Sequence, residues 1–170
     1  MYRIEKLTNS HKKDDFDCGE GSLNDFLFSY AKQNAKKDLS QTYVAVDPDA
    51  DDKLVLGYYS ISCGSVEFQE LPDPANIPTQ YPIPTVLLAR LARDKSASGL
   101  GPILLLDSYR KVVEIANIAG VHVYEVDALH AAARSFYEKY DFVALEDAPL
   151  HLFQTVKDIR KVVEAMDANP

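Results

Sequence analysis

The spacing of apolar residues divides the N-terminal part of the chain into one strand and one helix. Residues 2–7 alternate polar and apolar side chains, which is typical of an edge strand. From Ser22 to Asn34 the apolar residues recur every three or four positions, so this stretch is predicted to be an amphipathic helix with one face on a core. Ser22 and Asp25 resemble an imperfect capping box, and we expect the helix to begin there.

The middle of the chain carries the pattern of sheet strands. Residues 41–46 and 54–66 flank the acidic loop 47–53 and are predicted to form a hairpin, with Gly57 as a candidate bulge. Five prolines in residues 67–84 predict a long surface connection. Residues 85–92 form a mostly apolar run, which is typical of a central strand buried on both faces.

The C-terminal half alternates helical and extended patterns. A long helix is expected to begin at Pro102 and to end at Gly120, since proline suits a first helical turn and glycine suits the residue after a helix. The remaining predicted elements are strands at 121–126, 142–145 and 150–156 and helices at 130–140 and 157–167. This order predicts an α/β fold with a mixed sheet.

Composition narrows the class of protein. The chain has 170 residues, 46% of them hydrophobic and 26% charged, so it can bury one sizeable core and is not intrinsically disordered. No apolar run is long enough to cross a membrane, and the N-terminus lacks the pattern of a secretory signal. Two cysteines, Cys18 and Cys63, make neither a disulfide framework nor a metal quartet, and a cytoplasmic location is expected.

The net charge of −8 opposes nonspecific nucleic-acid binding by the whole surface. Local basic clusters remain as candidates for a patch, and as solvated surface charges they need no function. The clusters are Lys32 with Lys36 and Lys37, Arg90 with Arg93 and Lys95, and Arg110 with Lys111.

A glycine-containing loop at residues 96–102 joins the apolar run to the long helix. Backbone N–H groups at such a place favour a phosphate or diphosphate, because the start of a helix leaves its first amides unpaired. The loop has neither the dinucleotide-binding glycine spacing nor the lysine of a P-loop. By itself the motif is better explained as a tight turn between a strand and a helix.

A second candidate lies in the predicted helix 130–140. Phe136 and Phe142 are expected to pack in the core, whereas Tyr137 projects about 100° away from Phe136, toward a ligand or a half-buried position. The four histidines show no metal-binding spacing, so no metal site is expected. Cys63 lies in an apolar strand and is expected to be a packing residue.

Together, the glycine loop and the F-Y-E-x-x-x-F stretch resemble the GCN5-related N-acetyltransferase (GNAT) superfamily. A set of short motifs is more specifically similar to the acetyltransferase toxins of bacterial toxin–antitoxin pairs, over residues 2–160. The motifs are Phe16-Asp17-Cys18-Gly19, Leu23-Asn24-x-Phe26-Leu27, Gln33-Asn34, Ser40-x-Thr42-Tyr43-Val44, Leu56-Gly57-Tyr58-Tyr59, Gly64-Ser65-Val66, Tyr81-Pro82-x-Pro84 and Leu88-Ala89-Arg90-Leu91-Ala92-Arg93-Asp94.

The resemblance implies a GNAT fold in one domain over residues 1–170: a mostly antiparallel, twisted sheet of about six or seven strands, flanked by helices and splayed between its central parallel strands. It also implies transfer of acetyl from acetyl-coenzyme A (acetyl-CoA) to the α-amino group of aminoacyl-tRNA. Further implications are a ribbon-helix-helix antitoxin as partner and a homodimer.

The same resemblance assigns roles to individual residues. Backbone groups of Leu91, Ala92 and Arg93 would hold the pantetheine arm. Tyr137 matches a tyrosine near the thioester sulfur. The diphosphate would be cradled by Ser98, Gly99, Leu100, Gly101 and Pro102, and the candidates for contacting tRNA are Lys32, Lys36, Lys37 and Arg90.

One departure from the family pattern keeps other functions open. The loop after Asp94 is about two residues shorter than in the family, and the usual glutamine or arginine is missing. The first hypothesis is therefore acetylation of charged tRNA, and the second is acetylation of a small-molecule or protein amine, which the acidic net charge favours slightly. A third is a degenerate GNAT domain that binds its antitoxin or DNA without catalysis.

Overall fold

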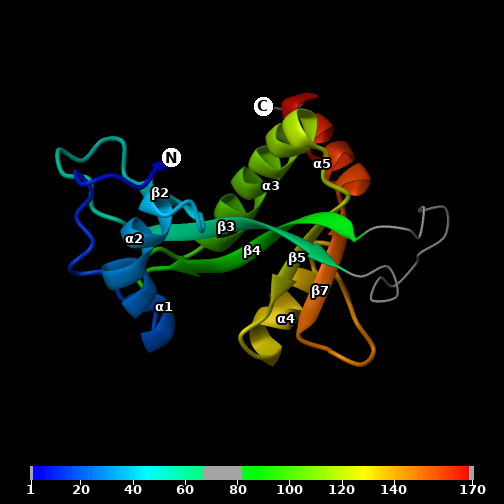
Figure 1. Cartoon of the computed structure of the whole chain (residues 1–170). Helices are drawn as coiled ribbons and strands as arrows, with labels where there is room; N and C mark the ends of the chain where they lie inside the picture. Colours follow the sequence, from blue (N-terminus) through cyan, green and yellow to red (C-terminus); the bar gives the residue numbers. More distant parts are fainter. Residues whose placement is uncertain (1, 67–81, 169–170) are drawn as a thin grey trace. The chain divides into compact units, whose positions relative to one another are not determined.

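A computed structural model describes residues 2–66 and 82–168 (Figure 1). Its seven strands are hydrogen-bonded in the order β1-β2-β3-β4-β5-β7-β6. The strands are β1 (Arg3–Lys6), β2 (Gln41–Val46), β3 (Gly57–Val66), β4 (Ile83–Arg93), β5 (Val123–Asp127), β6 (Val143–Ala144) and β7 (His151–Thr155). The helices are α1 (Gly21–Asp25), the π-helix η1 (Phe26–Tyr30), α2 (Ala31–Lys36), α3 (Leu100–Ala119), α4 (Ala131–Glu138) and α5 (Val156–Ala168).

The chain divides into two compact units. The first unit is Met1–Ser62 with Ala89–Ser108, and the second is Cys63–Leu88 with Tyr109–Pro170. Most of the predicted proline-rich connection at 67–84 lies outside the described residues. The α/β class and the mixed sheet agree with the prediction from the sequence.

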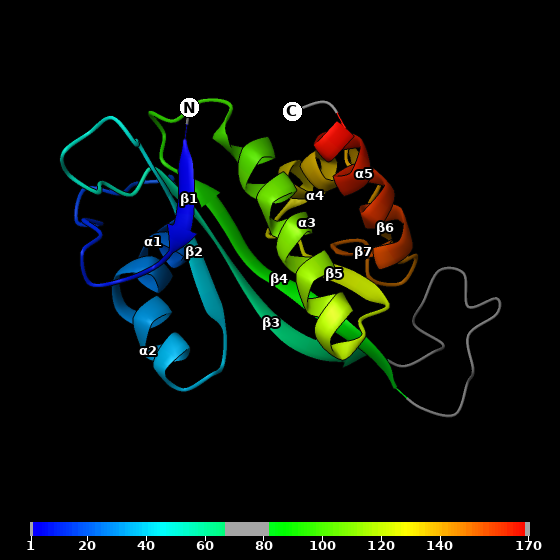
Figure 2. The ribbon, with the colours of Figure 1, turned by 90° about the horizontal axis from the view of Figure 1, so that it is seen from above.

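In the first unit, β1, β2 and β3 form an antiparallel sheet (Figure 2). The predicted bounds of the second strand, 41–46, are those of β2. Alternate residues of the strands enter a core with the N-terminal helices, because one face of each strand points toward α1, η1 and α2. This core contains Phe16, Phe26, Leu27, Ala31, Val44, Val55, Tyr58 and Ala92.

The N-terminal helix differs from the prediction in which residues face the core, because one of its turns contains an extra residue. The N–H of Ala31 donates to the carbonyl of Phe26, so the middle of the helix is a π turn with one extra residue. Leu27 and Ala31 are fully buried, whereas Tyr30 is 56% exposed. The predicted capping box is wrong, because Glu20 is the N-cap residue and no side chain caps the helix.

Gly57 allows a close approach of backbone and side chains. Its register opposite Ala45 is regular, so the predicted bulge is wrong. A Cβ atom at Gly57 would lie 2.7 Å from Cδ2 of Leu100 and 3.0 Å from Cδ1 of Leu104. The start of α3 therefore packs directly against β3 where β3 has no side chain.

The second unit pairs parallel and antiparallel strands. Thr85–Leu88 of β4 pair in parallel with Val123–Val126 of β5, and β7 pairs antiparallel with both β5 and β6. Val66, Ile83, Val123 and Phe153 form the core of this sheet. The parallel pairing stops at Leu88, whereas β4 continues to Arg93, as a splayed central pair requires.

Helices of the second unit are joined by side chains. Arg110 of α3 makes an ion pair with Asp167 of α5. Gly120 follows α3 with a φ of 72°, which confirms the predicted helix end. Within the described ranges, none of the helices is both long and apolar enough to span a bilayer.

Candidate functional site

The turn after β4 uses most of its backbone N–H groups within the protein. The N–H of Asp94 donates to the Leu56 carbonyl at 2.8 Å, and the N–H of Lys95 donates to the Asp17 carbonyl at 3.0 Å. The N–H of Ser96 donates to the Asp94 carboxylate at 2.9 Å. The N–H of Ala97 donates to the Asp94 carbonyl at 3.0 Å. The path of the chain into the loop is thereby fixed.

The next residues leave donors available. In the described part of the chain, neither Ser98 nor Gly99 has a hydrogen-bond acceptor for its N–H. Gly99 has a φ of 78°, a conformation that glycine adopts without strain. The helix begins at Leu100 rather than at Pro102 as predicted, so Gly101 belongs to the first turn, where amides have no intrahelical acceptor. These donors and the helix dipole can bind an anion.

Only part of β4 pairs with β5. Beyond Leu88 no described residue of β5 pairs with β4. Ala92 is buried, whereas Leu91 is partly buried and Arg93 is exposed. Unpaired strand N–H and C=O groups can hydrogen-bond an amide-containing chain laid beside them, as the resemblance expects for Leu91–Arg93.

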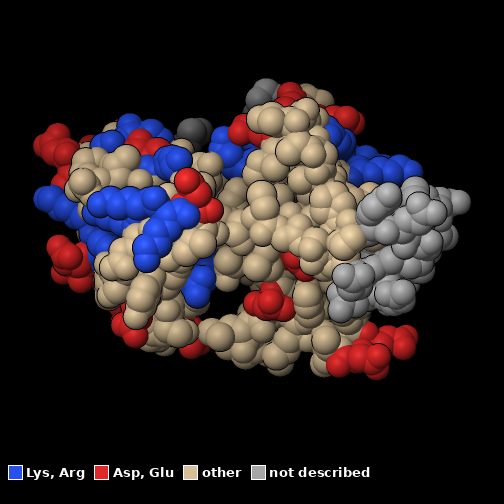
Figure 3. Space-filling view, in the orientation of Figure 1, with Lys and Arg blue, Asp and Glu red and all other residues tan. Residues whose placement is uncertain are grey.

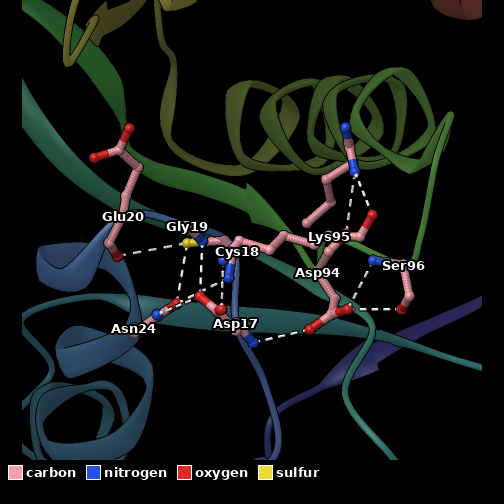
Figure 4. Close-up of polar contacts among 9 residues, drawn as sticks. Asp17, Cys18, Gly19, Glu20, Asn24, Asp94, Lys95 and Ser96 are labelled. Carbon is pink, nitrogen blue, oxygen red and sulfur yellow. Dashed lines mark hydrogen bonds and ion pairs between the residues drawn. The ribbon is translucent and has the colours of Figure 1, made fainter.

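A polar network joins this turn to the segment before α1 (Figure 4). The Asp17 carboxylate accepts from Lys95 Nζ at 2.6 Å, from Gly19 N–H at 2.9 Å and from Asn24 Nδ2 at 3.0 Å. The Lys95 hydrogen bond, followed by those of Gly19 and Asn24, lowers the pKa of Asp17 to about 2. Asp17 thus stays ionised at neutral pH.

Asp94 is the second carboxylate of the network. It accepts from the Asp17 N–H at 2.8 Å and from the Ser96 hydroxyl at 2.6 Å, in addition to the Ser96 N–H. Partial burial alone would raise the pKa of Asp94, but these hydrogen bonds outweigh it and lower the pKa. The loop therefore depends on contacts between residues that are far apart in the sequence, which no local pattern indicates.

Tyr137 is presented by α4 in the second unit. Its side chain is 6% exposed and lies among aromatic rings, with centroids 5.2 Å from Phe136 and 5.5 Å from Phe142. No described residue hydrogen-bonds its hydroxyl, and the only enclosed side-chain polar atoms without partners in the described ranges are Ser40 Oγ and Gln41 Oε1. The Tyr137 hydroxyl consequently keeps contact with solvent. Burial raises its pKa, so the phenol is a protonated donor at neutral pH.

The turn after α4 fixes the position of this tyrosine. The Tyr137 carbonyl accepts from Tyr140 N–H at 2.9 Å and from Phe142 N–H at 3.3 Å. Asp141 has a φ of 63°, a left-handed conformation that aspartate tolerates. Phe142 is in the core as predicted, but Phe136 is only partly buried because Tyr137 occupies the inner face of the helix.

Basic side chains gather over α2 and β2 of the first unit, on the left of Figure 3. Lys32 and Lys36 share a face of α2 through their i, i+4 spacing, and Lys37 follows the helix. The charge of Lys32 also contributes, after burial, to lowering the pKa of Lys13. The guanidinium of Arg90 lies 3.9 Å from the ring centroid of Phe26 in η1.

The other predicted basic clusters have partners within the protein. Lys95 pairs with Asp17, Arg110 with Asp167 and Lys111 with Glu114. Arg93 donates to the carbonyls of Asp94 and Lys95. These residues are therefore weaker candidates for a binding patch than Lys32, Lys36, Lys37 and Arg90.

Sequence reasoning missed a buried polar cluster in the second unit and misplaced one cysteine. Glu125 is 6% exposed and accepts from the Thr85 hydroxyl at 2.6 Å, and it pairs with His151 at 2.9 Å. Cys63 is exposed, so the prediction that it packs in a core is wrong. Among the residues that the structure describes, no three metal-ligating side chains come together.

Comparison with known proteins assigns the chain to a family. No protein-family model matches it. It is 33% identical over 160 residues to the tRNA-acetylating toxin of Mycobacterium tuberculosis, and the match covers 93% of this chain and 94% of that protein. The chain belongs to the GNAT-type acetyltransferase toxins of toxin–antitoxin systems.

Solved structures of this toxin family share the fold. A tyrosine-to-phenylalanine variant of KacT superposes with a TM-score of 0.88 at 31% identity, covering 95% of this chain and 98% of that one. AtaT in complex with acetyl-methionyl-tRNAfMet gives a TM-score of 0.86 at 29% identity, covering 95% and 99%. Other AtaT structures contain acetyl-CoA or the C-terminus of the antitoxin AtaR. The GNAT fold expected from the sequence is confirmed.

Proposed function

We propose that this protein is an acetyl-CoA-dependent N-acetyltransferase that acetylates the α-amino group of aminoacyl-tRNA and thereby blocks translation. The observation that carries the proposal is the similarity, over nearly the whole chain, to a tRNA-acetylating toxin. The two sites described above supply the groups that such a reaction needs. The proposed enzyme is one catalytic domain over residues 1–170.

The loop before α3 is the proposed diphosphate site. Ser98 and Gly99 have N–H groups without acceptors in the described structure, and Gly101 lies in the first helical turn. An anion there is also favoured by the helix dipole. Leu100 and Pro102 shape the loop, and backbone groups of Leu91, Ala92 and Arg93 are proposed to hydrogen-bond the pantetheine arm. The shortened loop therefore retains what a diphosphate requires, which supports a catalytic rather than a degenerate domain.

The proposed reaction is direct attack of the amine on the thioester. An α-amino group has a pKa of about 7.7–8.0, so an appreciable fraction is neutral at cytoplasmic pH and no strong base is needed. The nitrogen bonds to the acyl carbon, and a strand N–H beside Leu91 is proposed to stabilise the oxyanion. The carbon–sulfur bond then breaks, and the amine proton leaves through water.

Tyr137 is the proposed general acid. The hydroxyl is protonated at neutral pH, and we propose that it donates a hydrogen bond and then a proton to the departing thiolate. The phenol then recovers a proton from water.

The proposed tRNA surface is the basic face of the first unit. Lys32, Lys36 and Lys37 would contact phosphates, and these residues form a local patch on a chain whose net charge is −8. The guanidinium of Arg90 stacks on Phe26, which leaves its N–H groups available for a phosphate. A ribbon-helix-helix antitoxin, a homodimer and a cytoplasmic location are proposed on the family resemblance.

Mass spectrometry of bulk charged tRNA incubated with the protein and acetyl-CoA tests the function. We expect a gain of one acetyl group on the aminoacyl moiety of one or a few tRNA species. Acetylation of free amines or of protein amines with no change in charged tRNA would contradict the tRNA substrate. Lack of any acetyl transfer, together with no acetyl-CoA binding in calorimetry at millimolar ligand, would contradict the enzyme itself.

A further inference from the structure

We propose that Asp94, Asp17 and Lys95 are positioning residues for acetyl-CoA, which hold the turn before the diphosphate loop in its binding conformation. This inference rests on the proposed function, because it deepens the role of the same loop. None of the three residues is among those expected from the sequence to bind the donor. Their roles follow from the hydrogen bonds of the turn.

Asp94 organises the turn through both carboxylate oxygens. One oxygen accepts from Asp17 N–H at 2.8 Å and the other accepts from the N–H and hydroxyl of Ser96. The Ala97 N–H in turn donates to the Asp94 carbonyl. The amides of residues 95–97 are therefore directed into the protein, and the first amides left for a ligand are those of Ser98 and Gly99.

The Asp17–Lys95 pair joins the turn to the segment before α1. Its partners are 52% and 63% exposed, and exposed ion pairs contribute little to stability. The pair is nevertheless part of a defined arrangement, because Lys95 N–H also donates to the Asp17 carbonyl at 3.0 Å. The pair therefore matters for the position of the turn rather than for the stability of the fold.

Gly19 makes room for this arrangement. It has a φ of 90°, and a Cβ atom there would lie 3.1 Å from Cε of Lys95. The lysine stem thus lies against a residue that lacks a side chain and adopts a conformation favoured by glycine. Both the path and the end of the Lys95 side chain are fixed by the segment 17–19.

The short loop explains why such a network matters. A loop that is already in its bound conformation loses less conformational entropy when it binds. By its resemblance to the family pattern, this loop is expected to be about two residues short and to offer fewer backbone groups to a diphosphate. By holding the loop in its bound conformation, Asp94, Asp17 and Lys95 are expected to raise the affinity for acetyl-CoA and so to offset the smaller number of backbone contacts. They are expected to have no role in the chemical step.

Calorimetry with acetyl-CoA, together with kcat and KM measurements, tests the proposal. Asp94→Ala is expected to weaken acetyl-CoA binding about tenfold, because hydrogen bonds to a charged group are lost. Lys95→Met is expected to weaken it about threefold, as an exposed pair allows, and Lys95→Arg to restore most of the affinity. In each variant kcat at saturating acetyl-CoA should stay within about twofold, because the network does not act on the transition state alone.

Lys161→Met is the matched control. Lys161 pairs with Asp158 at 2.7 Å and is 66% exposed, so it resembles Lys95 in geometry and exposure but belongs to α5. Its substitution should leave acetyl-CoA affinity unchanged. Equal affinities of wild type, Asp94→Ala and Lys95→Met would overturn the proposal. If Asp94→Ala does not fold, the Lys95 variants test the proposal by themselves, because substitution of an exposed side chain is expected to leave the fold intact.

Asp17→Asn distinguishes positioning from direct contact. Loss of the pair is expected to weaken binding, whereas tighter binding would mean that a released Lys95 contacts the diphosphate itself, and would overturn the positioning role. These measurements also distinguish a failure of the positioning role from a failure of the proposed function. Wild type that binds acetyl-CoA but leaves charged tRNA unmodified contradicts the proposed function, while the affinity series still tests the network.

Discussion

The loop before α3 and the turn after α4 hold the groups proposed to act in catalysis by opposite means. The loop is ordered by exposed charges, since the side chains of Asp17 and Lys95 are each more than half exposed. The turn holds Tyr137 by aromatic packing, and the tyrosine is nearly inaccessible. Each arrangement matches the group that it presents.

Backbone amides that bind an anion have to remain open to solvent until the anion arrives. They cannot be fixed by burial, so hydrogen bonds that neighbouring N–H groups donate to the Asp94 and Asp17 carboxylates fix the backbone instead. Burial of the Tyr137 ring raises the pKa of its phenol, so the hydroxyl stays protonated at neutral pH and is able to donate a hydrogen bond. The loop should therefore be sensitive to changes of backbone and charge, and the turn to changes of the hydroxyl.

The largest effect is expected from Tyr137→Phe. Loss of the hydroxyl removes the proposed proton donor but retains the ring packing, so kcat should fall about 10²–10⁴-fold with little change in thermal stability. Steady-state acetylation of charged tRNA measures this. Tyr140→Phe, in the same turn, is the control and should keep its activity. Full kcat in Tyr137→Phe would exclude Tyr137 as the acid.

Substitution of two glycines that both have positive φ can distinguish an effect on the loop before α3 from a general loss of stability. Gly99 and Gly120 both have positive φ, and at each of them a Cβ atom would meet only open space. Replacement of either by alanine is expected to cost about 1–2 kcal/mol of strain. Only Gly99→Ala should also weaken acetyl-CoA binding, several-fold in calorimetry. Equal acetyl-CoA affinity in the two variants would argue against the loop as the diphosphate site.

Substitution of the α2 cluster tests where tRNA binds. Changing Lys32, Lys36 and Lys37 together to methionine should raise KM for charged tRNA about fivefold and reduce the salt dependence of binding, because fewer counterions are released. The affinity for acetyl-CoA should not change. Lys161→Met, a single lysine on α5, serves as the control. An unchanged KM and salt slope would place the tRNA contacts elsewhere.

The smallest effect concerns the acid side of the stability profile. A hydrogen bond from Lys53, with a further one from His11, lowers the pKa of Glu5 to about 2. A lowered folded-state pKa adds stability above the ordinary value near 4.5, and this stability is lost as pH falls toward 2. Glu5→Gln should therefore be less stable than wild type by about 0.5–1 kcal/mol at pH 7, and the difference should vanish near pH 2. Thermal unfolding at both pH values measures it, and a constant difference would contradict the pKa.

Local patterns were sufficient where the structure depends on local physics. The bounds of β2 and the helix end at Gly120 follow from side-chain alternation and from the backbone freedom of glycine. The resemblance to GNAT toxins, which depends on short motifs, predicted the family and the fold. Asp141 adopts a positive φ in the turn after α4, a conformation that aspartate tolerates.

Other features were missed because they depend on tertiary contacts. The π turn at Phe26–Tyr30 has almost the same apolar spacing as an α-helix, so periodicity did not distinguish them. The bonds of Asp17 to Lys95 and Asp94 join residues separated by more than 70 positions. Cys63 lies in a strand of apolar appearance, but its side chain faces solvent. The assigned roles of Tyr137 and of the donor-binding loop remain predictions.

The close packing at Gly57 predicts which mutations would inactivate the protein. A methyl group there would lie 2.7 Å from Cδ2 of Leu100 and 3.0 Å from Cδ1 of Leu104, so the packing of these side chains at the start of α3 would have to change. A selection for bacteria that survive expression of this protein should therefore recover substitutions at this strand position alongside those in the loop itself. Such survivors would be inactive although the sequence of the proposed diphosphate loop is intact.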